Sequence, residues 1–154
     1  MPKVFSLFEN SSSSAVLVVA EIGKNFIQTE KDRPIAEYLQ NAKDLVLIAK
    51  QAGADAVKFQ THYVADEIMP IPFSSPHFSA VDRYHWVKRN EDATPLLTFW
   101  QPLQAYCEQI GIIFFSTPMS RGAAKILNEQ VGVDLWQIGS GDILDFVMLD
   151  YMRN

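Results

Sequence analysis

Short apolar runs alternate with helix-like segments along this chain, and that alternation restricts the fold more than any other feature. The predicted strands are residues 15–20, 56–60, 112–116 and 135–138. The predicted helices, with apolar residues at helical spacing, are residues 35–52, about 95–110, about 121–130 and a last one from near Phe146. Apolar strands separated by helices are typical of a parallel sheet with right-handed crossovers. The sequence therefore predicts an α/β fold of about four βα units.

Two architectures share this alternation, a doubly wound open sheet and a (β/α)₈ barrel. A complete barrel takes about 250 residues, so a chain of 154 residues supplies roughly half of one. In both architectures ligands bind at the carboxyl ends of the strands. The residues that close the strands are therefore the first candidates for a site.

Composition excludes several classes of protein. The net charge is −5 and the basic residues are scattered, which argues against a nucleic-acid partner. The single cysteine, Cys107, lies in an apolar helical pattern, which predicts a packing role and agrees with a reducing compartment. No apolar run is long enough to span a membrane. We expect a cytoplasmic protein with a flexible lead-in or short β-ribbon over residues 1–14 and one domain over residues 15–154.

A long segment, residues 61–94, interrupts the second βα unit. It is rich in proline and contains Trp86 and a basic group at Arg83, Lys88 and Arg89. A loop of this length is either a wall of the site or a surface excursion packed by its own aromatic residues. The three histidines, His62, His77 and His85, do not have the spacing of a metal site.

The residues at the predicted strand ends are polar. They are Glu21, Lys24 and Asn25 after the first strand, Lys58 and Gln60 in the second, Ser116 and Thr117 in the third, and Gln137, Ser140 and Asp142 after the fourth. Lys58 is the sharpest signal, because an unpaired ammonium in an apolar strand is costly. Either an anionic ligand or an ion pair with Glu21 would offset that cost. Glu21 and Asp142 are candidates for proton transfer or for holding a hydroxylated substrate, although carboxylates at strand ends are often merely solvated.

Four motifs together resemble the sialic acid synthase (N-acetylneuraminate synthase) family. They are Ala20-Glu21-Ile22-Gly23 with Asn25, Ala52 to Thr61 (AGADAVKFQT), Phe115-Ser116-Thr117-Pro118, and Ile138-Gly139-Ser140-Gly141-Asp142. The resemblance covers the first half of that family's (β/α)₈ barrel. It implies condensation of phosphoenolpyruvate with N-acetylmannosamine or a related amino sugar, release of phosphate, a divalent metal such as manganese or magnesium, and a homodimeric full-length enzyme.

The resemblance also implies roles for individual residues. Lys58, Gln60, Thr117 and Ser140 match residues around phosphoenolpyruvate, Glu21 matches the acid that contacts the sugar, and Asp142 matches an acid close to the reacting carbons. Gln137 occupies a position where the family commonly has a second phosphate-binding lysine. The family's metal-binding histidines lie on later strands, so we expect no metal ligand in this chain and little or no turnover by the chain alone.

Two other functions fit the same sequence. One is a non-catalytic remnant of the barrel that binds an anion or associates with itself through open sheet edges. The other is a heptulosonate-type synthase, which shares the barrel and the use of phosphoenolpyruvate but matches these motifs less well.

Overall fold

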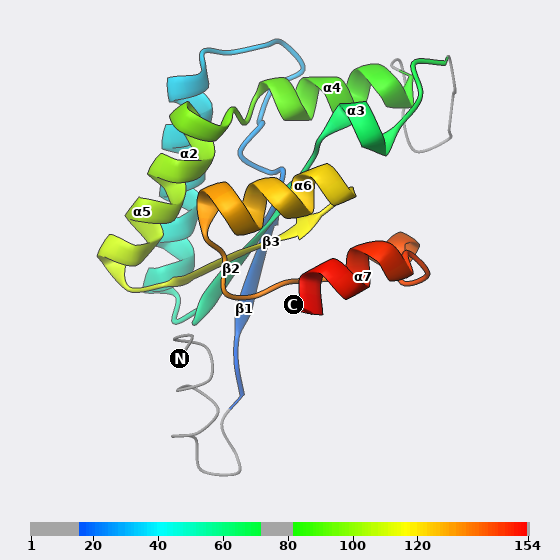
Figure 1. The fold of residues 1–154 in the computed structure, drawn as a ribbon. Coiled ribbons are helices and arrows are strands. Elements are labelled where there is room, and N and C mark those ends of the chain that lie inside the picture. Colours follow the sequence, from blue (N-terminus) through cyan, green and yellow to red (C-terminus); the bar gives the residue numbers. More distant parts are fainter. Residues whose placement is uncertain (1–15, 72–81, 154) are drawn as a thin grey trace.

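The computed structural model describes residues 16–71 and 82–153. Its centre is a three-stranded parallel sheet in the order β1 (Val19–Gly23), β2 (Ala56–Thr61) and β3 (Ile113–Pro118), with helices connecting the strands (Figure 1). The sequential order of parallel strands confirms the predicted α/β class. The predicted lead-in, residues 1–14, lies outside the described residues.

The first strand begins later than the sequence predicts. It covers Val19–Gly23 rather than residues 15–20, and its ladder starts with the pair Val19 and Ala56. Before that pair the chain is bonded differently: the Val18 amide donates to the Asp55 carboxylate (2.8 Å), and the Val18 carbonyl accepts from the Asp55 amide (2.9 Å). Val18 is therefore bonded to Asp55 just before the ladder begins.

The fourth predicted strand does not form a ladder, so the expectation of four strands is wrong for the described residues. Within residues 135–138 only Trp136 pairs with the sheet, through one parallel bridge to Ser116. Gln137 and Ile138 are exposed. Without a further strand beside it, this segment has one neighbour and keeps only one bridge to β3.

Two helices cover one face of the sheet. They are α2 (Ile35–Gln51) and α5 (Gln101–Ile110), which lie side by side in Figure 1. Their buried residues Ala42, Val46 and Leu103 pack in one core with Val57 and Phe59 of β2. Both helices lie close to their predicted ranges.

Cys107 of α5 belongs to this same core and is fully buried. Burial raises the pKa of its thiol to about 12. The side chain therefore packs as an apolar group and is not a reactive thiolate, as the sequence predicts.

The predicted helix over residues 95–110 consists of two parts. A π-helical turn, η1 (Leu96–Trp100), precedes α5. In it the Trp100 amide donates a hydrogen bond to the carbonyl of Pro95, five residues earlier (3.3 Å). Pro102 in the first turn of α5 has no amide hydrogen and its ring would collide with the carbonyl four residues earlier. The wider turn is consistent with that proline, because π-turns accommodate such interruptions.

The remaining elements lie around the ends of the strands. The 61–94 segment contains α3 (Val64–Glu67) and α4 (Arg83–Asp92), which lie beyond the carboxyl ends of the strands in Figure 1. After β3 come α6 (Arg121–Ile126), the π-turn η2 (Leu127–Val131), the 3₁₀ turn η3 (Ser140–Asp142) and α7 (Phe146–Arg153). None of the helices in the described part of the chain is long and apolar enough to cross a membrane.

Candidate functional site

The polar strand residues share the face of the sheet that points away from α2 and α5. Val57 and Phe59 face those helices, so alternation along β2 directs Lys58 and Gln60 to the opposite face. The register places Glu21 beside Lys58 and Thr117 beside Gln60. The structure thus brings four of the predicted site residues into one patch across three strands.

Lys58 and Glu21 form an ion pair across β1 and β2. The Lys58 side chain is only 8% exposed, whereas the Glu21 side chain is 55% exposed. The predicted ion pair is therefore present, and the ammonium is the buried member. An ammonium has three hydrogens to donate, so the pair with Glu21 and a bond to an anion are compatible, and anion binding by Lys58 stays a prediction.

Thr117 connects the sheet to the segment after η2. Its side chain is buried, and its hydroxyl donates a hydrogen bond to the Gln137 side-chain oxygen (3.0 Å). The exposed Gln137 thus lies next to Thr117 even though residues 135–138 are barely paired with β3. At this position the chain offers a neutral amide rather than a positive charge.

The Gly139-Ser140-Gly141-Asp142 turn folds the Asp142 carboxylate back over Gly139. A methyl group on Gly139 would lie 2.7 Å from Asp142 Oδ2 and 3.6 Å from Thr117 Cγ2, so a larger residue there would displace the Asp142 side chain. Burial, followed by the nearby charges of Asp145 and Glu67, raises the pKa of Asp142. Ser140 begins η3 and is exposed.

Together these contacts form one polar patch at the carboxyl ends of the strands. Its members are Glu21, Lys58, Gln60, Thr117, Gln137 and Asp142, with Ser140 at its edge. The arrangement offers one buried cation, neutral hydrogen-bonding groups and two carboxylates. Such a set can bind an anion bearing a carboxylate or phosphate and can hold hydroxyl groups of a second molecule.

No three His, Cys, Asp or Glu side chains within residues 16–71 and 82–153 are grouped so that they could hold a metal ion. The patch therefore does not fit a resident divalent cation by itself. The absence of a metal ligand from the whole chain stays a prediction.

A second polar cluster, beside the patch, escaped the sequence analysis. Lys24, which follows β1, bonds through its Nζ to His62 Nε2 (2.8 Å), and His62 Nδ1 lies 2.7 Å from a Glu67 carboxylate oxygen. The Lys24 ammonium also lies 3.3 Å from the centre of the Trp86 ring. Lys24 and His62 both follow strands, and those positions were the available signal. Glu67 and Trp86 come from the 61–94 segment, whose folding could not be derived from the sequence.

Two of the three basic residues in that segment, Lys88 and Arg89, form ion pairs with nearby carboxylates. Arg89 pairs with Asp32 (2.8 Å) and donates to the Thr29 carbonyl (2.5 Å), which ties α4 to the loop after β1. Lys88 pairs with Asp92 on the same helix. Neither side chain is directed to the polar patch by these contacts.

The family model of the NeuB family matches residues 45–154 of this chain. The chain belongs to the NeuB family. The match confirms the resemblance to sialic acid synthases and includes every member of the polar patch except Glu21. Human N-acetylneuraminate-9-phosphate synthase is 30% identical over 137 residues, which are 86% of this chain and 34% of that enzyme.

Two solved structures have a similar fold. The N-acetylneuraminic acid synthetase of Leptospira borgpetersenii, solved with citrate, superposes with a TM-score of 0.63 at 24% identity over 89% of this chain and 40% of that one. The spore coat polysaccharide biosynthesis protein spsE of Bacillus subtilis gives a TM-score of 0.58 at 26% identity over 91% of this chain and 34% of that one. The chain thus spans about a third of the length of the curated relatives it matches.

Proposed function

We propose that this chain is the phosphoenolpyruvate-binding part of a sialic acid synthase-type enzyme, which condenses phosphoenolpyruvate with N-acetylmannosamine or a related amino sugar and releases phosphate. The observation that carries the proposal is the buried Lys58 on the same sheet face as Gln60 and Thr117. The relationship to N-acetylneuraminate-9-phosphate synthase supports the same reaction class.

Lys58 would bind the anionic substrate. An ammonium that is 8% exposed and has one carboxylate partner gains from a second anion, because charge-assisted hydrogen bonds are strong where water is scarce. Ser140 would add a hydroxyl donor and Gln60 an amide without adding charge, and Thr117 would donate to the substrate in place of its bond to Gln137. Phosphoenolpyruvate, with a carboxylate and a phosphate on a small frame, fits that chemistry.

The two carboxylates would act on the second substrate. Glu21 is half exposed beside Lys58, so it can accept hydrogen bonds from sugar hydroxyl groups. Asp142, whose pKa is raised by burial, is the better proton carrier of the two. Gln137 would contact the phosphate as a neutral hydrogen-bond donor, which predicts weaker phosphate binding than a lysine would give.

The whole reaction needs more than the described residues offer. We infer that the three βα units are the first part of a (β/α)₈ barrel, and that the divalent metal, manganese or magnesium, would be held by residues outside this chain. Little or no turnover is expected from the chain alone. In the complete enzyme a homodimer is the expected assembly.

A chimera tests this proposal. The chain replaces the matching region of human N-acetylneuraminate-9-phosphate synthase, and phosphate release from phosphoenolpyruvate is measured with manganese and an N-acetylmannosamine substrate. We expect release by the chimera and at least about a hundredfold less with Lys58→Met, since a charged hydrogen-bond partner of the substrate is lost. The matched control, Lys125→Met on the exposed side of α6, should release phosphate at the rate of the parent chimera. Equal rates in both variants would refute the role of Lys58.

A non-catalytic role is the second candidate, and the exposed apolar residues favour it. Phe146 is 71% exposed and Val147 62% exposed on α7, and Val16 is 81% exposed before β1. A remnant of the barrel would use these surfaces for self-association. A folded chimera that binds phosphoenolpyruvate but never releases phosphate would favour this candidate.

A further inference from the structure

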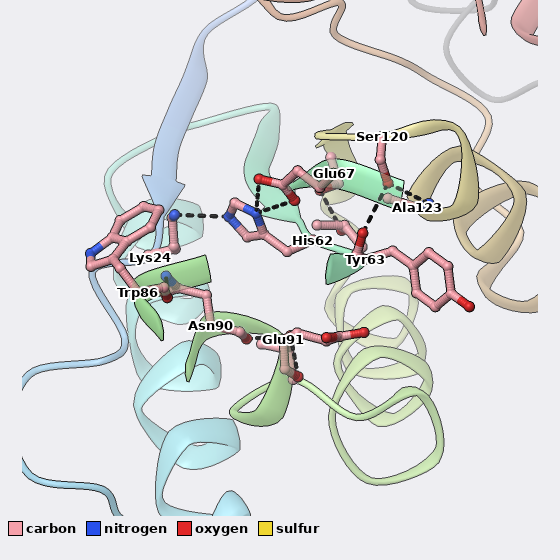
Figure 2. Close-up of polar contacts among 12 residues, drawn as sticks. Lys24, His62, Tyr63, Glu67, Trp86, Asn90, Glu91, Ser120 and Ala123 are labelled. Carbon is pink, nitrogen blue, oxygen red and sulfur yellow. Dashed lines mark hydrogen bonds and ion pairs between the residues drawn. The ribbon is translucent and has the colours of Figure 1, made fainter. Parts of the chain in front are cut away.

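A chain of buried polar groups joins the turn after β1 to the 61–94 segment. Lys24 Nζ lies 2.8 Å from His62 Nε2, and His62 Nδ1 lies 2.9 and 2.7 Å from the two carboxylate oxygens of Glu67. The side chains of His62 and Glu67 are 2% and 4% exposed. Figure 2 shows the three residues in line, with Trp86 against the Lys24 end.

The partners determine where the protons are. The Glu67 carboxylate accepts, so His62 Nδ1 carries a hydrogen and donates it. An ammonium on Lys24 can only donate, so His62 Nε2 accepts from it and is unprotonated. A neutral His62 in the Nδ1–H tautomer thus lies between a cation and an anion.

Other charges nearby favour the same assignment. Arg83 of α4 also faces the cluster, and its positive charge lowers the pKa of both His62 and Lys24. A second positive charge on His62 would meet both Lys24 and Arg83. Desolvation by burial is the largest cause lowering the His62 pKa, ahead of the hydrogen bond to Glu67, which opposes it.

Lys24 also belongs to a tight turn that carries Glu21. Gly23 has a left-handed backbone (φ 54°), and a side chain there would contact Glu21 Oε1 at 3.2 Å. The Asn25 amide bonds to the Ile22 carbonyl (3.0 Å), which closes the turn. Because only Ile22 and Gly23 separate Lys24 from Glu21 along the chain, we expect a displacement of Lys24 to shift the backbone that carries the carboxylate paired with Lys58.

We propose that Lys24, His62 and Glu67 form a positioning relay, with His62 held as the Nδ1–H tautomer, that fixes α3, α4 and the Glu21 turn together over the carboxyl ends of β1 and β2. The relay joins four segments: the turn after β1, the end of β2, α3 through Glu67, and α4 through Trp86. The residues act through Glu21 and do not contact substrate themselves. The inference goes beyond the proposed function, and it holds whatever the substrate is.

Nitrogen NMR of the full chain labelled with ¹⁵N-histidine tests the tautomer directly. The His62 signals are assigned by elimination, as those that remain in both His77→Gln and His85→Gln, neither of which alters a relay residue. At pH 7 we expect His62 Nδ1 to be protonated and Nε2 to be an unprotonated acceptor. An Nε2–H tautomer or an imidazolium at pH 7 would overturn the proposal, and this measurement needs no folded variant at the relay.

Fluorescence of Trp86 tests the connection to Lys24. The ammonium lies on the indole face, and burial lowers the Lys24 pKa to about 7. We expect the emission of the full chain to change with a midpoint near that pH, and the change to vanish in Lys24→Met and Trp86→Phe. Lys43→Met, which removes an ammonium 5.3 Å from the Tyr106 ring on another helix, is the matched control and should keep the change.

A conservative variant separates positioning from mere packing. Lys24→Arg keeps the cation over Trp86 but does not titrate, so the pH-dependent change should disappear while α3 and α4 remain protected from proteolysis. Lys24→Met and Glu67→Gln should increase cleavage within residues 64–92 at least severalfold. Unchanged proteolysis in both of these variants, with circular dichroism like that of the parent, would overturn the positioning role.

Discussion

The charge of the polar patch depends on the ion pair between Lys58 and Glu21. Lys58 is buried, yet its carboxylate partner Glu21 is largely exposed. The two partners therefore differ in what their removal costs. Removing the carboxylate leaves a buried unpaired charge, whereas removing the lysine leaves a solvated one. A substitution of Lys58 should therefore leave the fold intact for a binding test, whereas a substitution of Glu21 should change the free energy of unfolding.

Glu21→Gln should lower the free energy of unfolding by about 1 kcal/mol, because the buried ammonium loses its only described ionic partner. Urea denaturation measures the change. Glu37→Gln is the matched control: Glu37 pairs at 3.8 Å with Arg33 on an exposed helix turn, and its loss should cost less than about 0.5 kcal/mol. Equal effects of the two substitutions would show that the Glu21–Lys58 pair does not stabilise the fold.

Lys24 should give the stability a distinct pH dependence. Its folded pKa is about 7, below the usual value, because desolvation outweighs the attraction of Glu67. Between pH 7 and the unfolded pKa the unfolded chain binds the proton and the folded chain does not, so this group makes stability rise with pH across that window. We expect the unfolding free energy of the parent chain, relative to Lys24→Met, to increase between pH 7 and 9.5, by at most about 1.4 kcal/mol per pH unit. A constant difference between parent and variant would contradict the lowered pKa.

At the scale of the elements, local signals explain why the strands and long helices were predictable. The apolar run of β2 and the helical spacing of α2 are encoded within each segment, and both appear where the sequence indicates. The strand prediction for residues 135–138 was wrong because a strand needs a paired neighbour as well as an apolar pattern, and this segment has only one bridge. The π-turn before α5 is consistent with Pro102, but a pattern of apolar residues does not reveal such a turn.

The candidate site divides in the same way. The patch around Lys58 and Thr117 was predictable because the carboxyl ends of parallel strands meet at one edge. The choice between an ion pair and a ligand for Lys58 was not, because the sequence does not give the rotamer of Glu21. The Lys24–His62–Glu67 relay was missed because its contacts depend on how α3 and α4 fold back over the strand ends.

Ser120 connects α6 to the segment after β2 through two hydrogen bonds, so its substitution should destabilise that junction. Its hydroxyl oxygen accepts from the Ala123 amide (3.2 Å) and its hydroxyl donates to the Tyr63 carbonyl (3.5 Å). Ser120→Ala should lower the unfolding free energy by about 1 kcal/mol, as expected for loss of a helix N-cap. Ser120→Thr should retain most of the stability in the same denaturation experiment. A Thr variant as unstable as the Ala variant would show that capping is not the cause.

At the scale of the whole molecule, the sheet leaves apolar surface uncovered. Exposed side chains gather before β1 and on α7, where Phe146 is 71% exposed. In the barrel that we propose, further strands and helices would cover these surfaces. Their exposure connects the proposal of an incomplete barrel to a measurable property of the isolated chain.

The isolated chain should self-associate through these surfaces. Sedimentation equilibrium should show an average mass that increases with concentration, and substituting Phe146 and Val147 with lysine should reduce the increase, because charges oppose apolar contact. Met69→Lys, at a similarly exposed apolar residue of the 61–94 segment, is the matched control. A parent chain that stays monomeric at all concentrations would contradict this prediction.

Binding of phosphoenolpyruvate to the 154-residue chain tests the central proposal most directly. Calorimetric titration of the parent chain is compared with Lys58→Met and with the exposed-lysine control Lys125→Met, all checked for folding by circular dichroism. We predict saturable binding to the parent and to Lys125→Met, weakened at least tenfold in Lys58→Met. Binding that is absent from the parent, or that is equally strong in Lys58→Met, would contradict the assignment of this patch to phosphoenolpyruvate.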